Sequence, residues 1–380
     1  MVNVFTPNKK QSLLASQDWI LNFAALALSF IGVLLVYAAT KPRLEITETS
    51  TEYYLIRHVG TLLVGVVLAI LISRSQYTLL RAYAPILYLV GVIGLIVVLI
   101  PGIGTEINGI RAWIAIPGGF TLQPAELAKL AIVLGMSMIL AEAQQPGIEP
   151  EDKEVGLALL LAAIPLGLIL LQPDLGTAII VGVIILAVIA ISAAGMKWIF
   201  GLVGSALFAM LLLVVLGILD EYQINRLLTF IDPGRDPLVS GYNLIQVKLA
   251  IGTGGFTGWG LFDGPQTNGR FIPSQQTDFI YATAGEAFGF IGGVLIIALL
   301  GIVTWRALLI AQGADRFGRL AATGVAAWLG FQTFQNIGMN LGIMPITGVP
   351  LPFISYGGTS MFAVWMAVGL LQNIRGRSRD

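Results

Sequence analysis

Long apolar runs separated by short polar segments make up most of this chain. Each run has roughly 17–25 residues, the length that an α-helix needs to cross about 30 Å of hydrocarbon. They lie near residues 20–40, 54–73, 84–101, 125–144, 155–171, 177–194, 198–219, 279–312, 320–341 and 357–373. The pattern predicts an all-α polytopic membrane protein of about ten transmembrane helices, forming a single domain over residues 1–380.

One long polar segment, residues 220–278, separates the seventh and eighth predicted helices. Its Asp232-Pro233 pair favours a turn, and residues 242–251 predict a short helix resting on the membrane interface. The glycine-rich run 252–258 lacks the preceding strand of a dinucleotide site. It either forms simple turns or brings bare backbone N–H groups close to an anion.

The distribution of Lys and Arg predicts the orientation in the membrane. An even number of spans puts both termini on one side, and short loops rich in Lys and Arg favour the cytoplasmic side. Cytoplasmic termini place Arg74, Arg81, Lys197 and Arg316 inside. We therefore expect both termini in the cytoplasm and the 220–278 loop on the outer face.

Composition supports a membrane protein and excludes several functions. The chain is 56% hydrophobic and 11% charged, which is more apolar surface than a water-soluble domain buries. Its formal net charge is zero, so it lacks the basic surface that nucleic acid requires. The absence of cysteine excludes disulfides, thiolate catalysis and Cys-based metal sites.

Ionisable residues inside predicted spans need an explanation, because each costs about 2.5–3.5 kcal/mol at the bilayer centre. Glu126 and Lys129 lie three residues apart on one helical face, as a packing pair or as part of a substrate site. Two further charged residues, Asp174 and Arg111, fall on the same predicted outer side of the membrane as this pair. Asp174 lies at the tip of a tight hairpin between the fifth and sixth spans. Glu286 accompanies glycines at four-residue spacing, which permit close helix approach.

Asp278 ends the long loop immediately before the eighth span. Thr277 is a predicted N-cap, which would place Asp278 in the first helical turn. The helix dipole there stabilises a carboxylate by about 0.3–1 kcal/mol. The same residue type also fits a plain helix start.

Several stretches, in order along the chain, carry a resemblance to a known family. They are Asn108-Gly109 with Arg111 and Trp113, residues 123–126 with Lys129, residues 172–177, Asp232-Pro233, residues 241–243 with Gln246, Gly254-Gly255, residues 277–279 and residues 345–360. Together they resemble the SEDS family (shape, elongation, division and sporulation), the RodA/FtsW-like peptidoglycan polymerases. Departures at Ala125, Gln276 and Ala287 bear on the branch, and we favour the RodA-like, elongation branch.

The resemblance implies an inverting glycosyltransferase that polymerises lipid II, an undecaprenyl-diphosphate-linked disaccharide-peptide, at the outer face of the bacterial cytoplasmic membrane. Asp278 would be the catalytic base. The residues expected to bind substrate are Arg111, Lys129, Arg226, Glu126, Asp174 and Glu286. The cations among them would hold the leaving pyrophosphate.

Cofactors and partners follow from the same resemblance. No cofactor is required by the sequence, although a divalent cation, Mg or Mn, would suit pyrophosphate chemistry. Expected partners are lipid II, the growing glycan strand, a class B penicillin-binding protein transpeptidase, other cell-elongation proteins and membrane lipids. A lipid II flippase and a non-catalytic scaffold of a cell-wall complex are the alternative functions.

Overall fold

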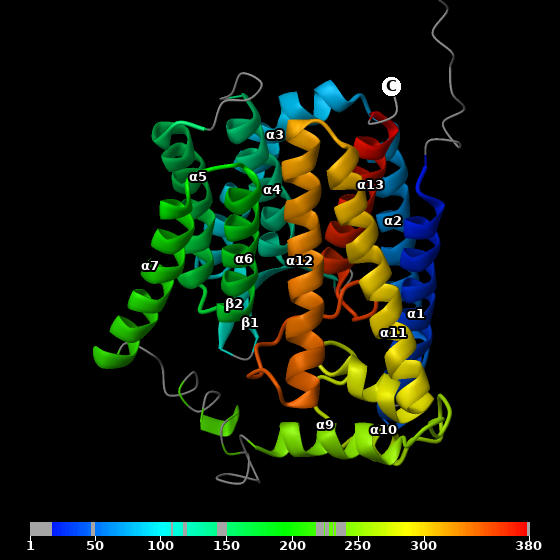
Figure 1. Ribbon diagram of the computed structural model, residues 1–380. Coiled ribbons are helices and arrows are strands. Elements are labelled where there is room, and N and C mark those ends of the chain that lie inside the picture. Colours follow the sequence, from blue (N-terminus) through cyan, green and yellow to red (C-terminus); the bar gives the residue numbers. More distant parts are fainter. Residues whose placement is uncertain are drawn as a thin grey trace, which may run out of the picture.

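The protein is a bundle of long helices, and a small sheet and short helices lie at one end of it (Figure 1). The computed structural model describes residues 17–46, 50–107, 109–116, 120–142, 150–217, 224, 228–230, 232 and 241–377. The long helices are α1 (Trp19–Ile46), α2 (Tyr53–Arg74), α3 (Tyr77–Leu99), α4 (Pro124–Glu142), α5 (Asp152–Leu170), α6 (Leu175–Ile191), α7 (Met196–Val215), α11 (Ile280–Gly313), α12 (Arg316–Leu341) and α13 (Gly358–Arg377).

Each predicted span coincides with one of these helices, which confirms the helical membrane fold. Six of them, α1 to α5 and α11, are long and apolar enough to cross a membrane by length and composition. The helices α12 and α13 are less apolar because they face protein, and most of their residues are buried. That all ten helices cross the bilayer stays a prediction.

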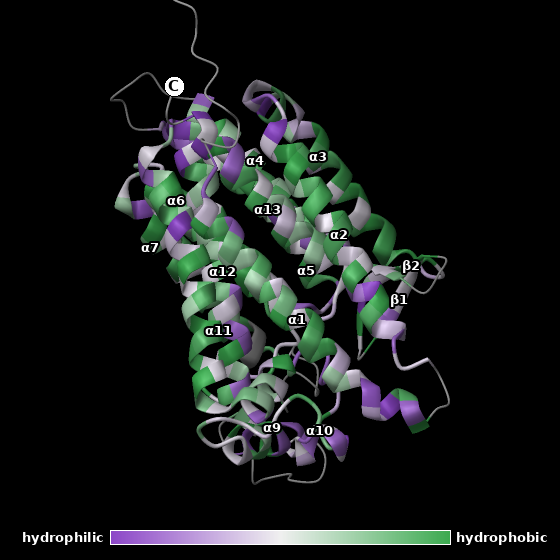
Figure 2. Ribbon diagram, turned by 90° about the vertical axis from the view of Figure 1, so that its right-hand side faces the viewer, coloured by the Kyte–Doolittle hydropathy of each residue, from purple (hydrophilic) through white to green (hydrophobic). Residues whose placement is uncertain are grey.

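The apolar surface of the bundle lies where lipid would cover it. In Figure 2, hydrophobic residues dominate the long helices, whereas hydrophilic residues gather towards the two ends of the bundle and on the short helices. Inside the bundle, close packing depends on small residues. A Cβ on Gly369 of α13 would lie 2.6 Å from the carbonyl oxygen of Ala69 in α2, so the two helices pack at a distance that only glycine permits there.

Between α3 and α4 in the sequence, the chain forms a three-stranded antiparallel sheet, which the all-α prediction missed. Its strands are β1 (Gly104–Ile107), β2 (Ile110–Ile116) and β3 (Phe120–Leu122), in the order β1-β2-β3. Gly109 has a φ of 78° at the turn between β1 and β2. Asn-Gly flanked by β-branched residues is a strong hairpin signal, so the sequence contained this sheet's clearest marker.

Two short helices lie at the same end as the sheet. The predicted interfacial helix is present as α9 (Tyr242–Thr253), which lies across the ends of the long helices, followed by α10 (Pro265–Asn268) (Figure 1). Because α4, α6 and α11 all begin at this end, it also contains Asp174, Glu126, Lys129 and Asp278.

The helix α11 is broken at Gly289, where φ is 63° and ψ is −160°. The glycine-rich loop that follows α9 fills the break. Trp259 N donates to Glu286 O at 3.0 Å, and Phe290 N donates to Gly255 O at 2.9 Å. A Cβ on Gly258 would lie 2.2 Å from Ala287 O. The expected close helix approach is found at Gly285, where an added Cβ would lie 3.1 Å from Ile251 Cγ1 of α9, whereas Gly289 admits the glycine-rich loop.

Candidate functional site

Asp278 lies in a turn that precedes α11, and the predicted N-cap is wrong. The helix begins at Ile280 with Phe279 as its N-cap. Instead of capping the helix, the hydroxyl of Thr277 donates to the carbonyl oxygen of Ser274 at 3.1 Å. The N–H groups of residues 277–279 converge on the same carbonyl. Asp278 is half-buried just outside the helix.

Side chains from α12 hold the backbone of Asp278. Its carbonyl oxygen accepts hydrogen bonds from Asn336 Nδ2 at 2.9 Å and Asn340 Nδ2 at 3.1 Å. Both amides are fully buried. The position of Asp278 is therefore determined by a helix distant in sequence.

The loop between α12 and α13 holds the two residues before Asp278. The hydroxyl of Ser355 donates to Thr277 O at 2.6 Å, and Tyr356 N donates to Gln276 O at 2.9 Å. The same loop passes the Asp278 side chain: a Cβ on Gly348 would lie 3.6 Å from Asp278 Oδ2. The motif at residues 345–360 therefore forms one wall beside this carboxylate.

Glu126 and Lys129 form the ion pair that their spacing predicts. The Nζ of Lys129 lies 2.8 Å from Glu126 Oε1 and 2.9 Å from Gln332 Oε1. It also lies 4.8 Å from the centroid of the Trp328 ring. Both members of the pair are almost completely buried, so the lysine charge is compensated inside the bundle.

Asp174 is the N-cap of α6 and lies beside this pair. Its carboxylate accepts hydrogen bonds from Thr177 N at 3.0 Å, from Thr177 Oγ1 at 2.7 Å and from Gln123 Nε2 at 3.3 Å. It interacts electrostatically with both Lys129 and Glu126. The structure thus brings together three charged residues that the sequence placed on one side.

The amides of α12 were missed from the sequence, and they connect these groups. Gln332 accepts from Lys129 and donates through Nε2 to Pro350 O at 2.8 Å. Gln332, Asn336 and Asn340 repeat at intervals of four residues, which places them on one helical face. A row of amides on one face of a predicted span was the signal available in the sequence.

The other predicted residues are placed differently. Arg111 lies in β2 with its Nη2 3.4 Å from Glu106 Oε2, and both side chains are partly exposed. Glu286 is buried on α11 and accepts hydrogen bonds from Thr267 N at 2.9 Å and Thr267 Oγ1 at 2.6 Å, which attaches α10 to the helix. Glu286 follows Asp278 by eight residues in the sequence. Arg226 lies outside the described residues.

A divalent cation finds no ready ligand set in the part of the chain that the structure describes. There, no group of three or more His, Cys, Asp or Glu side chains is arranged to hold a metal ion.

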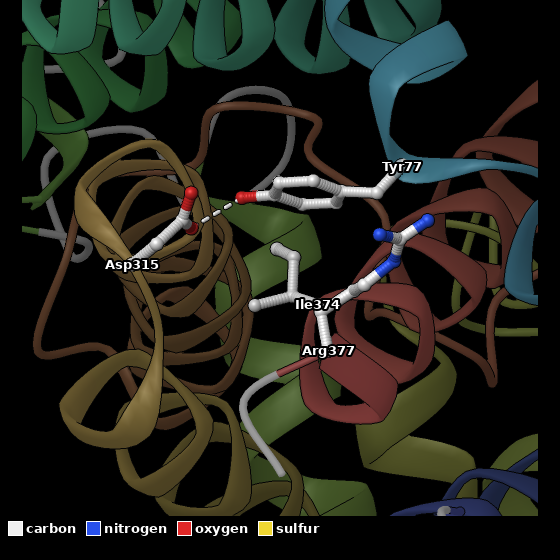
Figure 3. A pocket seen from close by; sticks show the side chains of 4 residues that line it. All are labelled: Tyr77, Asp315, Ile374 and Arg377. Carbon is white, nitrogen blue, oxygen red and sulfur yellow. Dashed lines mark hydrogen bonds between the residues drawn. The ribbon is translucent and has the colours of Figure 1, made fainter. Parts of the chain in front are cut away.

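A pocket at the opposite end of the bundle is lined by Tyr77, Asp315, Ile374 and Arg377 (Figure 3). The Tyr77 hydroxyl donates to Asp315, whose carboxylate also caps α12 by accepting from Gly318 N at 2.9 Å. These hydrogen bonds join α3 to α12 far from the Asp278 turn, and Arg377 of α13 lies with its Cζ 5.9 Å from the centroid of the Tyr77 ring. The pocket is separate from the predicted site.

Comparisons with known proteins agree with the motifs. The family model "Cell cycle protein", of FtsW, RodA and SpoVE, matches residues 18–380. The probable peptidoglycan glycosyltransferase FtsW of Trichlorobacter lovleyi is 37% identical over 96% of this chain and 95% of that protein. The peptidoglycan glycosyltransferase MrdB of Escherichia coli K12 is 33% identical over 92% of this chain and 90% of that protein.

The fold agrees as well. The fold is similar to that of a chain in a solved structure whose subject is the structural coordination of polymerization and crosslinking by a peptidoglycan synthase complex. The TM-score is 0.76 and the sequence identity is 32%, and the match covers 94% of this chain and 97% of that one. These matches span nearly the full length of every protein compared. The protein described here therefore belongs to the SEDS family, the FtsW, RodA and SpoVE proteins.

Proposed function

We propose that this protein is a peptidoglycan glycosyltransferase that polymerises lipid II into glycan strands at the outer face of the bacterial cytoplasmic membrane. The observation that carries the proposal is the placement of Asp278. Its backbone carbonyl accepts a hydrogen bond from Asn336 of α12, and the loop between α12 and α13 binds the preceding Thr277. This turn lies at the end of the bundle that also contains Glu126, Lys129 and Asp174. Relatives of comparable length are named for this activity.

Asp278 supplies the base for the reaction. The hydroxyl oxygen of the acceptor sugar forms a bond to the anomeric carbon of the donor, and the bond from that carbon to the pyrophosphate oxygen breaks with inversion. Asp278 accepts the hydroxyl proton, and the lipid diphosphate leaves. Because a carboxylate is a weak base at neutral pH, proton transfer is concerted with attack on the anomeric carbon.

Cations near this end stabilise the departing pyrophosphate. Arg111 is suited to the role because its guanidinium is partly exposed and its pairing with Glu106 is an exposed one, which is typically weak. Arg226, in the long loop, is the second candidate. Lys129 is committed to Glu126 and Gln332, and we propose that it orders the start of α4 and α6 rather than binding phosphate directly.

We propose a crosslinking partner and a branch of the family. A structural relative belongs to a complex that coordinates polymerization with crosslinking, which supports a class B penicillin-binding protein transpeptidase as partner. Relatives named FtsW and MrdB have similar sequence identities to this chain, so overall similarity does not separate the branches of the family. The proposed elongation role therefore rests on the residues at positions 276 and 287, Gln276 and Ala287. Rescue of elongation-deficient cells, without rescue of division-deficient cells, would support it.

Polymerisation by purified protein tests the proposed function. Protein in detergent, alone and with its partner, is incubated with lipid II, and glycan strands are resolved on a gel. We expect polymer from wild type and none from Asp278→Asn, while Asp263→Asn, an exposed acid of the same loop, retains activity. Equal rates for wild type and Asp278→Asn would refute Asp278 as the base. No polymer from wild type under either condition would favour the flippase or scaffold alternatives.

A further inference from the structure

The carbonyl of Asp278 is diverted out of the helix that follows it. In an α-helix containing Asp278, this oxygen would accept a hydrogen bond from the N–H four residues later, which belongs to Ala282. Instead, Ala282 N donates to Phe279 O at 3.0 Å. The Asp278 oxygen is satisfied by Asn336 and Asn340. Because a buried carbonyl requires a partner, these amides remove the need for Asp278 to join α11.

Asn336 connects three segments with one amide. A carboxamide has two N–H donors, and Nδ2 of Asn336 donates to Asp278 O at 2.9 Å and to Val349 O at 2.7 Å. Val349 follows Gly348, which has a φ of 72° and lies against the Asp278 carboxylate. Asn336 therefore links the backbone of Asp278 to the chain segment that flanks its side chain.

We propose that Asn336, supported by Asn340, is a positioning residue that holds Asp278 outside α11 and directs its carboxylate towards the acceptor sugar. Without these donors, the Asp278 carbonyl finds its nearest alternative in the N–H of Ala282, and α11 lengthens towards its N-terminus. Each residue added to a helix rotates the side-chain direction by about 100°. The carboxylate then leaves its place beside Gly348. The proposal rests on the proposed function of Asp278 as base.

Steady-state kinetics distinguish positioning from a general loss of structure. Asn336→Ala removes both donors, and Asn336→Asp keeps the shape but has no N–H group. The matched control is Asn373→Ala at the other end of the bundle, where the amide donates to Ile72 O at 2.8 Å and to Ser75 O at 2.7 Å.

We expect the kcat of both Asn336 variants to fall by about 100-fold, since small displacements of reacting groups have effects of that size. Their KM should stay within about twofold of the wild-type value. Asn373→Ala should lose comparable thermal stability and keep the wild-type kcat per folded molecule. An Asn336→Ala variant whose kcat stays within about threefold of that control would overturn the proposal. If Asn336→Ala does not fold, Asn340→Ala, which removes only one donor to Asp278, takes its place.

A second measurement needs no polymerase activity. The chain contains no cysteine, so Asp278→Cys introduces its only thiol. The rate of alkylation by a small water-soluble maleimide is compared with Asn336 intact and with Asn336→Ala, and again with Asn373→Ala. We expect a change of about tenfold or more in the Asn336→Ala background only. Equal rates in all three would refute positioning by Asn336, even if wild type made no polymer and the proposed function failed.

Discussion

Lys129 Nζ lies 2.8 Å from Glu126 Oε1, and their side chains are 0% and 2% exposed. Removing one member of a buried pair leaves the other charge without compensation, which costs about 3–5 kcal/mol. An exposed pair contributes about 1 kcal/mol or less. The chain offers such a pair for comparison in Lys197 and Asp152, which are 64% and 63% exposed.

We predict that Lys129→Met lowers the thermal stability of the detergent-solubilised protein far more than Lys197→Met does. The double variant Lys129→Met with Glu126→Gln should recover part of the loss, because it leaves no unpaired charge. Thermal unfolding followed by intrinsic fluorescence is measured for wild type, Lys197→Met, the single variants Lys129→Met and Glu126→Gln, and their double variant. A double variant as unstable as the sum of the two single variants would show that the pair is not coupled.

The break in α11 requires glycine at position 289. Its φ of 63° is unfavourable for an L-residue, and an added Cβ would lie 2.5 Å from Gly258 N. We predict that Gly289→Ala destabilises the protein by at least about 2 kcal/mol through strain and overpacking. Gly301, also in α11, has nothing within 4 Å of an added Cβ, so Gly301→Ala should be neutral or stabilising. Equal melting temperatures for the two variants would contradict this account.

Glu286 should control the docking of α10. Its carboxylate accepts hydrogen bonds from Gln266 N at 2.6 Å and from Thr267 N at 2.9 Å. In Glu286→Ala these donors lose their acceptor, at about 1–3 kcal/mol each. We predict faster amide hydrogen exchange over residues 266–268 and little change in α12. Asp263→Ala, which changes an exposed acid nearby, is the control. Unchanged exchange in Glu286→Ala would exclude an anchoring role.

The orientation in the membrane is testable because the chain has no cysteine. Asp263 is exposed in the loop before α10, and Lys153 is exposed at the start of α5, at the other end of the bundle. We predict that a membrane-impermeant maleimide added to spheroplasts labels Asp263→Cys, and that Lys153→Cys reacts only after the membrane is permeabilised. The reverse pattern would place the Asp278 end in the cytoplasm.

Local sequence patterns were sufficient for the helices but not for every turn. Hydropathy located each long helix because helices that face lipid, and helices that pack inside the bundle, are both mostly apolar along their length. The sheet was missed although Asn108-Gly109 indicated a hairpin. The predicted helix start at Thr277 was wrong because the backbone carbonyls of Thr277 and Asp278 accept hydrogen bonds from Ser355 and Asn336 instead of from the helix. These two donors are distant in sequence, so the residues around Thr277 do not reveal them.

By itself, the sequence determined the membrane class, the position of the helices and the family, because hydrophobic length and ordered motifs are local properties. The glycine spacing in α11 also indicated a close contact, yet only the structure identified the loop at Gly258 as the partner. The spacing of Glu126 and Lys129 predicted their buried ion pair, whereas tertiary structure alone decided the partners of buried polar side chains that bind residues distant in sequence. Asp278 and Asn336 are 58 residues apart, and the requirement that buried polar groups be hydrogen-bonded does not specify a partner until the helices have packed.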